Sequence, residues 1–259
     1  MRSEGSNYWV AFVTIFTKEV ARLFRIWMQV FVPPVVTMSL YFIIFGHLIG
    51  RRIGTMGGVD YMQYIAPGLV MMAVIQNAYM NTCSSFFGAK MQRHLEELLV
   101  APIPRYIIIL GYMAGGVARG VLIGAVVMGI SLFFTHLSIH HAWIVVLITL
   151  CTAVLFSLAG LINALFAKDF DDVGLVPTFV LTPLTYLGGV FYSIHWLPDF
   201  WRHFSKINPI LYMVNIFRYG VLGISDVPVY SALVVVVLFS VFLFMVCLYL
   251  FKKGVGFDL

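Results

Sequence analysis

Charged residues are scarce in this sequence of 259 residues. Asp, Glu, Lys and Arg make up 10% of the chain, whereas 61% of the residues are hydrophobic, and the mean hydropathy is +0.98. This composition excludes an ordinary soluble domain, because such domains carry about 25% charged residues. Cysteine is also rare. The three cysteines, Cys83, Cys151 and Cys247, all fall within apolar runs, so we expect small packing residues and no disulfide framework.

The sequence lacks motifs for nucleotide binding and for catalysis. It has no phosphate-binding loop of the form G-x-x-x-x-G-K-[ST], and no Gly-Lys pair occurs in it. If ATP drives this protein, ATP and Mg bind to another polypeptide, and we expect no cofactor in this chain. It also has no Gly-x-Ser-x-Gly elbow and no His-Glu-x-x-His motif, so an enzyme is not indicated.

Two further ligand classes have little support. There is no basic tract that favours nucleic acid. His136 and His140 have the i, i+4 spacing of a zinc pair, but no nearby Cys or carboxylate completes a site, so we expect no metal.

The sequence instead contains six apolar runs of about 20 residues, each long enough to cross the roughly 30 Å hydrocarbon core of a bilayer. They predict spans at about 29–49, 61–83, 106–134, 142–167, 173–191 and 231–251. We therefore expect an all-α polytopic membrane protein with a single transmembrane domain over residues 1–259. Six spans place both termini on one side, which holds ten of the sixteen Lys and Arg residues against five on the other. That side is expected to be cytosolic.

A helix is predicted before the first span. Residues 12–27 carry an apolar stripe on one helical face, and Lys18, Arg22 and Arg25 lie on another. This pattern predicts an amphipathic helix in the membrane interface. A simple positively charged anchor is the alternative.

The segment between the second and third spans has both charges and an apolar stripe. Residues 86–105 contain Arg93, Glu96 and Glu97, which are costly in lipid, together with leucines at helical spacing. The pattern predicts one amphipathic cytosolic helix that ends at Pro102. Its apolar side favours docking to a protein partner, whereas a solvated face stabilised by Arg–Glu pairs is the alternative.

The segment at 188–226, before the last span, is too apolar for a solvated loop, yet Leu197-Pro198 and Asn208-Pro209 interrupt it. It predicts one or two short re-entrant helices on the outer side. A surface-lying plug with no role in transport is the alternative.

Two predicted spans contain polar stripes, which are expensive in lipid. The stripe of the second span is Asn77 and Asn81, followed by Ser84 and Ser85, and that of the fifth span is Thr178, Thr182 and Thr185. A shared, partly hydrated substrate path and ordinary helix packing both explain them.

Arg119 is the one clear charge within a predicted span. It pairs with a polar group on another span or faces an anionic substrate. The glycines around it, at 111, 115, 116, 120 and 124, allow close helix approach and favour a structural role. In the turn before the fifth span, Asp169, Asp171 and Asp172 predict at least one N-cap.

Two motifs resemble one protein family. The stretch at 96–105, EELLVAPIPR, is similar to the signature after the second span of type-2 ABC exporter permeases. Phe191, Leu197-Pro198, Asn208-Pro209 and Arg218 resemble the outer motif of the same family. The resemblance covers nearly the whole chain and implies a type-V ABC transporter fold.

In that family, six-span subunits act as a homodimer with separate ATPase chains. The resemblance therefore implies that Arg93, Glu96 and Glu97 lie at the ATPase interface. It also implies that the second and fifth spans line the route between subunits.

The function expected from these features is that of the permease subunit of an ATP-driven exporter in a bacterial inner membrane. The substrate is expected to be lipid-like, amphipathic or drug-like, or a glycan, moved out of the cytosol or inner leaflet. An ATP-independent secondary carrier, channel or membrane assembly factor is the alternative. The absence of Asp and Glu from the predicted spans argues against a proton-coupled carrier.

Overall fold

The protein is almost entirely helical, and the computed structural model describes residues 4–256. In chain order the elements are α1 (Glu4–Arg25), α2 (Trp27–Tyr41), the π-helix η1 (Phe42–Ile49), α3 (Gly50–Ile53), β1 (Thr55–Met56), β2 (Val59–Asp60), α4 (Tyr61–Met91), α5 (His94–Val100), α6 (Arg105–Phe134), α7 (Ala142–Phe166), α8 (Phe170–Val176), the π-helix η2 (Pro177–Leu181), α9 (Thr182–Leu187), the 3₁₀-helix η3 (Ile194–Trp196), α10 (Asp199–Ile207), α11 (Pro209–Leu222) and α12 (Val229–Lys253). The short antiparallel hairpin of β1 and β2 was not predicted from the sequence. It turns at Gly57 and Gly58, which both have positive φ.

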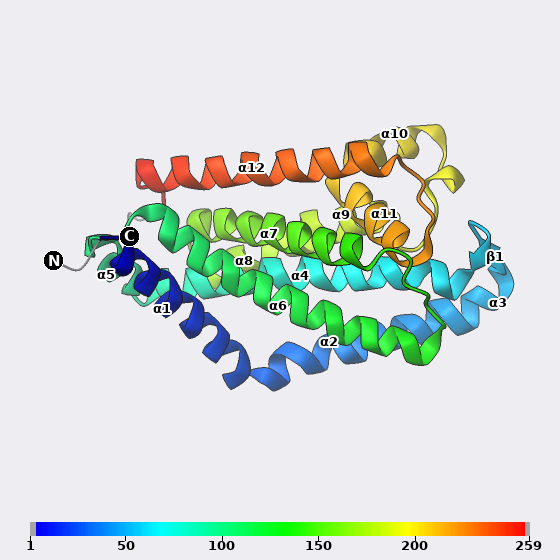
Figure 1. Ribbon diagram of the computed structural model, residues 1–259, viewed down its shortest axis with the longest axis horizontal. Coiled ribbons are helices and arrows are strands. Elements are labelled where there is room, and N and C mark those ends of the chain that lie inside the picture. The colour runs from blue at the N-terminus through cyan, green and yellow to red at the C-terminus, as the bar shows by residue number, and fades with distance from the viewer. Residues whose placement is uncertain (1–3, 257–259) are drawn as a thin grey trace.

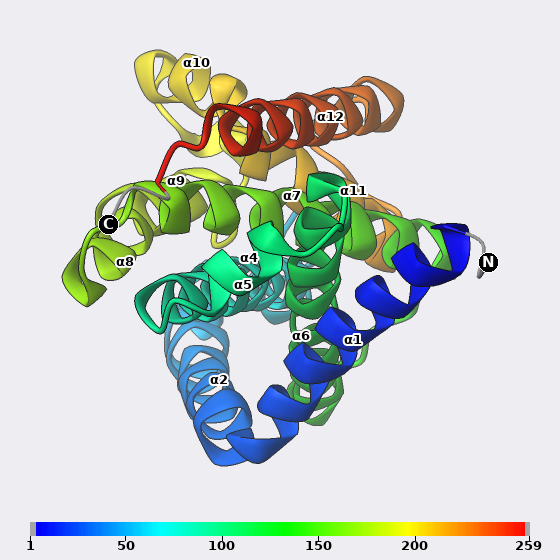
Figure 2. The ribbon, with the colours of Figure 1, turned by 90° about the vertical axis from the view of Figure 1, so that its left-hand side faces the viewer.

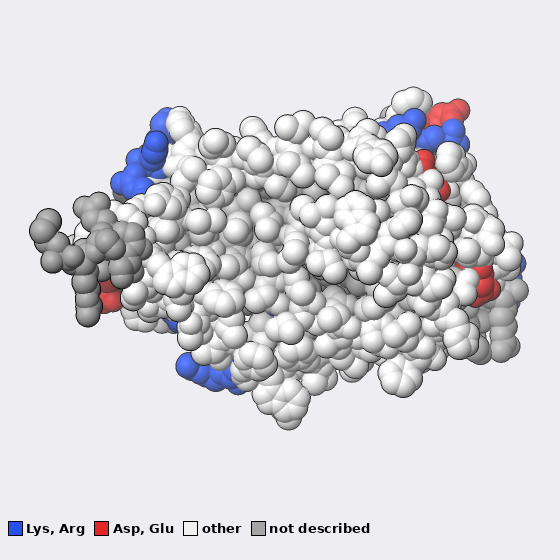
Figure 3. Space-filling view, in the orientation of Figure 1, with Lys and Arg blue, Asp and Glu red and all other residues white. Residues whose placement is uncertain are grey.

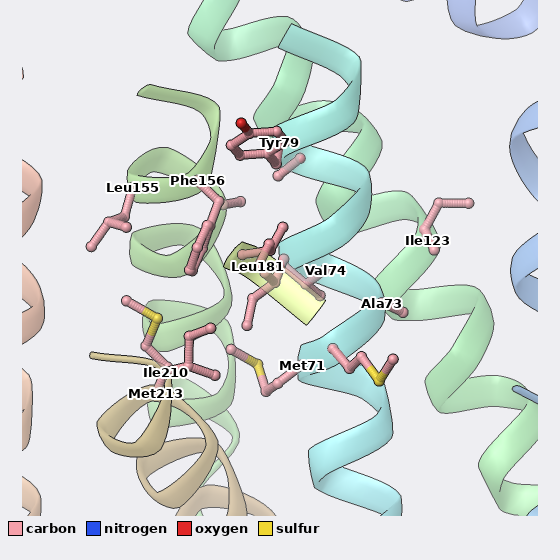
Figure 4. Packing of buried hydrophobic residues seen from close by; sticks show 14 of the residues in the cluster. Met71, Ala73, Val74, Tyr79, Ile123, Leu155, Phe156, Leu181, Ile210 and Met213 are labelled. Carbon is pink, nitrogen blue, oxygen red and sulfur yellow. The ribbon is translucent and has the colours of Figure 1, made fainter. Parts of the chain in front are cut away.

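Helix α4 lies at the centre of the molecule (Figures 1 and 2). Helices α6, α7 and α11 pack around it, α1 lies against α6, and α12 lies against α7 and α11. Figure 4 shows Met71, Val74 and Tyr79 of α4 among side chains that include Phe156 of α7 and Ile210 of α11. Since most residues of α4 are buried, the predicted second span is the core around which the subunit is built.

Glycines allow α6 to approach two neighbours closely. A Cβ added at Gly115 would lie 2.6 Å from Glu19 Cβ of α1, and one at Gly120 would lie 2.9 Å from Ala78 Cβ of α4. Carbon atoms do not approach so closely without displacement, so these contacts require glycine. The prediction that glycines near Arg119 permit close helix packing is confirmed.

Four stretches of the described helices are long and apolar enough to cross a membrane. They are Trp27–Gly46, Arg105–Phe134, Ala142–Phe166 and Val229–Lys253, which match the first, third, fourth and sixth predicted spans. Helix α4 has 31 residues but a more polar sequence, and the fifth predicted span is divided into α8, η2 and α9 around Pro177 and Pro183. The count of six spans therefore stays a prediction.

The charged residues are separated along the long axis of the bundle. Helix α1 begins and α12 ends at one end, here called the terminal end, and α3 and the hairpin lie at the opposite end (Figure 1). Figure 3 shows Lys, Arg, Asp and Glu gathered towards both ends, with a band free of charged residues between them on the face in view. This distribution is that of a protein whose middle faces lipid.

The predicted N-terminal helix is present, but it packs through a different face. Ile15, Glu19 and Leu23 are buried, whereas Phe24 and Trp27, from the predicted apolar stripe, are 59% and 52% exposed. The chain turns sharply between α1 and α2 (Figure 1). Phe12, Phe16 and Val20 of the stripe are half-buried, so its exposed end at Phe24 and Trp27 remains available for contact with lipid.

Candidate functional site

A buried polar contact joins α1 to the central helix near the terminal end. Glu19 is 2% exposed, and its Oε1 accepts a hydrogen bond of 2.6 Å from Ser85 Oγ of α4. Arg22 lies 3.7 Å from the other carboxylate oxygen and donates from Nη2 to Ser84 Oγ at 3.1 Å. Burial raises the pKa of the Glu19 carboxyl, and the Ser85 hydrogen bond and the Arg22 charge oppose that rise. We call Glu19, Arg22, Ser84 and Ser85 the polar joint.

The polar joint shows how the end of the second-span stripe is used. The hydroxyls of Ser84 and Ser85 contact α1, which is the helix packing given as one of the two explanations of the stripe. Glu19 is not among the residues that the sequence singled out, and its burial was not expected. The signal that could have found it is the i, i+4 series of Ile15, Glu19 and Leu23, which puts Glu19 on an apolar face.

The predicted helix over 86–105 is in fact two helices. Helix α4 continues to Met91, the chain turns at Arg93 with a left-handed φ of 59°, and the short helix α5 follows. The single-helix prediction is wrong because Arg93 leaves the right-handed helical region, which ends the first hydrogen-bond ladder. Helix α5 keeps the expected two faces: Leu95 is buried, while Glu96 and Glu97 are exposed, as is Arg93.

A cavity of about 500 Å³ lies between α1 and the other wall, which is formed by α5 and the segment that follows it. Its lining residues from α1 are Tyr8, Val10, Ala11, Thr14 and Ile15, and those from the other wall are Leu98, Pro102 and Ile103. The walls are mainly apolar, and the exposed charges Glu96 and Glu97 lie on the same short helix as Leu98. The terminal end thus presents an apolar hollow beside exposed charged residues.

Lys90 has a structural role that the sequence did not indicate. It is 6% exposed, and its Nζ donates to the backbone carbonyls of Leu165 and Ala167 at 3.0 Å and 2.9 Å. These carbonyls lie at the C-terminus of α7, where the last carbonyls of a helix lack donors and a cation is favourable. Lys90 therefore caps α7 and does not contribute to the exposed charges of this end.

Arg119 contacts the asparagine of the second predicted span. Its Nε donates to Asn77 Oδ1 at 3.2 Å, and Asn77 in turn donates to Ala73 O at 3.0 Å. Of the two alternatives given for Arg119, the structure thus shows a polar partner on another predicted span, and contact with an anionic substrate stays untested. Both residues line a cavity of about 270 Å³ between α2, α4 and α6, here called the Arg119 cavity.

The other candidate residues of the substrate path do not come together with this pair. Asn81 is 3% exposed. Thr182 and Thr185 donate to the carbonyls of Pro177 and Leu181 within their own segment. Thr178 is exposed. Over residues 4–256, no hydrogen bond joins the asparagines to these threonines, and their role in a substrate path stays a prediction.

A second arginine, Arg218 of α11, is fully buried in the bundle. It is 0% exposed, donates to Tyr64 O at 3.3 Å and to Gly189 O at 2.7 Å, and lies 3.9 Å from the centre of the Tyr64 ring. Sequence reasoning counted Arg218 with the charges of the outer side and missed its burial. Arg218 lies outside the predicted spans, so it is a second buried arginine beside Arg119, the one clear charge within a predicted span.

Arg218 belongs to a polar cluster near the hairpin end. Asp226 Oδ2 accepts hydrogen bonds from Tyr64 Oη at 3.1 Å and from Ser193 Oγ at 2.9 Å, and Asp226 N donates to Asn215 Oδ1 at 2.9 Å. These contacts tie α4 and α11 to the segments around η3 and before α12. The cluster explains why Arg218 is tolerated inside the bundle, because backbone carbonyls and an aromatic ring surround it.

The segment at 188–226 contains three short helical elements, η3, α10 and α11, and the prediction that it is re-entrant on the outer side stays a prediction. Helix α10 exposes Phe200, Trp201 and Phe204, whereas α11 is largely buried against α4, α7 and α12. Asn208 caps α11 by accepting from Ile210 N at 3.0 Å. The predicted N-cap before the fifth span is confirmed, since Asp169 Oδ1 accepts from Asp172 N at 2.9 Å.

Comparison with known proteins gives one consistent result. Residues 10–222 match the family described as ABC-2 type transporter. The chain is 60% identical over 250 residues to the protein named inner membrane transport permease YadH of Escherichia coli (strain K12), and the match covers 96% of this chain and 97% of that protein. The protein of the same name from Shigella flexneri matches with the same identity and coverage. The chain is also 27% identical over 188 residues to nodulation protein J of Rhizobium leguminosarum bv. trifolii, with 71% of each chain covered.

A match to a family of transporters agrees with the presence of several helices that are long and apolar enough to cross a membrane. The family is one of membrane transport subunits, so the chain is a multi-pass permease subunit and not an enzyme. The chain belongs to the ABC-2 type transporter family.

Proposed function

We propose that this chain is the permease subunit of an ATP-driven exporter, in which two copies work with separate ATPase chains. The complex resides in a bacterial inner membrane, and the terminal end of the permease faces the cytosol. ATP and Mg bind to the ATPase chains, because this sequence has no phosphate-binding loop.

The observation that carries the proposal is the surface made by α1 and α5. It combines the cavity of about 500 Å³ with the exposed side chains of Arg93, Glu96 and Glu97. An apolar hollow bordered by charges suits a protein partner, since apolar contact supplies affinity and the charges supply orientation. The ATPase is the partner that an ABC permease without a nucleotide site requires.

The same geometry offers a route for mechanical coupling. Helix α5 lies between α4 and α6 in the chain, so a force on α5 reaches both long helices directly. Helix α1 is held to α4 by the polar joint and to α6 by the close approach at Gly115. A partner that grips α1 and α5 together therefore acts on α4, the core of the subunit.

The proposed substrate class rests on the apolar character of the helix surfaces. The helices expose many large apolar side chains along their length. Such walls fit a lipid-like, amphipathic or drug-like substrate better than a long glycan, which needs a hydrated channel. Export from the cytosol or the inner leaflet is the proposed direction.

The experiment is a reversal of the docking charges. We expect Arg93→Glu combined with Glu96→Lys and Glu97→Lys to leave the permease inserted in the membrane. The free energy of binding between the triple variant and the co-expressed ATPase should be weaker by about 2–5 kcal/mol, because interfacial charges lose their partners. Co-purification and stimulated ATP turnover are the measurements.

The matched control reverses two exposed charges at the same end of the molecule, Lys252→Glu and Lys253→Glu on α12. It should keep the association with the ATPase. If the triple variant co-purifies and transports as the native chain does, the charges of α5 are a solvated face and the alternative of an ATP-independent carrier, channel or assembly factor gains support.

A further inference from the structure

The Arg119 cavity contains a cation without a counter-charge. Among the side chains that the structure describes, the ion pairs within 4 Å are Glu19–Arg22 and Asp199–Arg202, and neither includes Arg119. The charge that acts on Arg119 through space is that of Arg22, which is also positive. An arginine held at this depth without an acid partner is costly unless an anion accompanies it.

The donors of Arg119 are mostly unused. Nε bonds to Asn77 Oδ1, but over the described part of the chain no acceptor is found for Nη1 or Nη2. In Arg218, two nitrogen atoms bond to backbone carbonyls, the guanidinium lies on the Tyr64 ring, and Nη1 is sealed in the bundle without a partner among the residues that the structure describes. Arg119 instead lines a cavity, where its planar guanidinium is suited to a phosphate or a carboxylate.

The remaining walls of the cavity are neutral and partly polar. Gln29 and Thr37 of α2 and Gln76 of α4 line it together with Pro33 and Pro34. The amides and the hydroxyl can bond to further oxygen atoms of a head group, and no lining residue carries a negative charge. The volume of about 270 Å³ lies just below the about 300–1,000 Å³ of pockets that enclose drug-sized ligands, so it suits a head group whose apolar part lies outside.

The surroundings of the cavity are suited to that apolar part. Residues 29–37 of α2 fall within the stretch Trp27–Gly46 that is apolar and long enough to cross a membrane. Val32 and Val36, on the same turns of α2, are 48% and 51% exposed. Acyl chains can therefore lie along α2 while the head group reaches Arg119.

We infer that the Arg119 cavity binds the anionic head group, phosphate or carboxylate, of an amphiphile from the membrane. This rests on the proposed function and deepens it by giving the charge of the molecule that the permease takes up. Its test measures binding without the ATPase, so its failure is separate from failure of the proposed exporter.

The experiment titrates the purified full chain in detergent with short-chain phosphatidic acid and follows binding by native mass spectrometry. The matching diacylglycerol, which lacks only the phosphate, and inorganic phosphate serve as competitors. We expect saturable binding of phosphatidic acid that Arg119→Gln weakens at least tenfold and that diacylglycerol does not displace. Arg105→Gln, an exposed arginine at the start of the same helix, is the control and should bind as the native chain does.

A second variant keeps the test decisive if Arg119→Gln does not fold. Thr37→Trp fills the cavity from an exposed position on α2 and leaves the guanidinium in place, so it should block binding too. Binding that is unchanged in the variants that fold, or equal binding of diacylglycerol, overturns the inference. If inorganic phosphate at matched concentration displaces phosphatidic acid, the inference of an amphiphile is overturned and the site is assigned to a soluble anion.

Discussion

Ser85 Oγ of α4 donates a hydrogen bond of 2.6 Å to Glu19 Oε1 of α1. Glu19 is almost fully buried, and Arg22 lies 3.7 Å from its other oxygen. A helix that lies outside the main bundle is thus tied to the central helix through a buried carboxyl group. The protonation state of that group therefore bears on how firmly α1 is held.

The first prediction concerns Glu19 and pH. Because burial raises the folded-state pKa of Glu19 above its usual value of 4.5, the native chain binds this proton more tightly than the unfolded chain does. The contribution of protonated Glu19 to the stability of the folded chain is present in full below pH 4.5. It is lost as pH rises from 4.5 through the raised pKa of the folded state. Glu19→Gln stays neutral and keeps an oxygen for Ser85, so its melting temperature should fall less over this range than that of the native chain.

A second variant tests the sign of the same effect. Ser85→Ala removes a hydrogen bond that favours the charged carboxylate, so its loss of stability with rising pH should be steeper than in the native chain. Thermal unfolding of detergent-solubilised protein across this pH range is the measurement. Parallel curves for all three proteins would contradict the role assigned to Glu19.

The second prediction concerns the cap at the end of α7. Lys90→Met removes the donor to the carbonyls of Leu165 and Ala167, and we expect a loss of about 1–3 kcal/mol because buried acceptors are left unpaired. Hydrogen exchange should rise in the last turn of α7. Lys252→Met, in the exposed last turn of α12, is the control and should stay within about 0.5 kcal/mol of the native chain; equal losses in the two variants would refute the cap.

The roles of Lys90 and Arg218 mark what the sequence could not predict. The apolar runs gave the long helices correctly, and Pro, Asn and Asp marked where α8 and α11 begin, because these signals are local. Lys90 and Arg218 bond to backbone carbonyls far away in the chain, and a carbonyl acceptor has no residue type that a sequence pattern could reveal.

The candidate site was also predictable only in part, because single unusual residues are visible in the sequence but their contacts are not. Arg119 was recognised as an unusual charge, and its partner Asn77 was recognised as an unusual amide, since both are costly in lipid. Their contact could not be derived, because it depends on how α4 and α6 pack. The break at Arg93 was also unpredictable, since a left-handed φ at a non-glycine residue has no clear sequence signal.

The third prediction concerns the close contact between α1 and α6. An alanine at Gly115 would bring its Cβ within 2.6 Å of Glu19 Cβ, so Gly115→Ala should displace α1 and cost about 1–3 kcal/mol. Gly129→Ala is the matched control on the same helix, because a Cβ there meets nothing within 4 Å. It should be neutral or stabilising by up to about 1 kcal/mol. Thermal unfolding and protease cleavage between α1 and α2 are the measurements, and a Gly115 variant as stable as the Gly129 variant would rule out the tight contact.

The last prediction concerns the proposed homodimer. A two-fold interface brings each residue near its axis close to its own copy. Asn77 belongs to the span predicted to line the route between subunits, but it is 8% exposed and bonded to Arg119, so it is poorly placed to reach a second subunit. Thr178 is a better position, because it is exposed on the π-helical segment η2 beside Phe179, which is 72% exposed, and π-helical turns are frequent at functional sites.

In a chain whose native cysteines are replaced, Thr178→Cys should form a disulfide-linked dimer in native membranes on mild oxidation. Leu238→Cys is the control, because it is 64% exposed on α12, which lies on a different side of the bundle from η2 and its neighbour α8 (Figure 2). Since both positions are exposed, random collision would crosslink both. Dimers from Thr178→Cys alone therefore indicate a specific interface at η2, whereas dimers from Leu238→Cys alone would place the interface on α12 and refute this geometry.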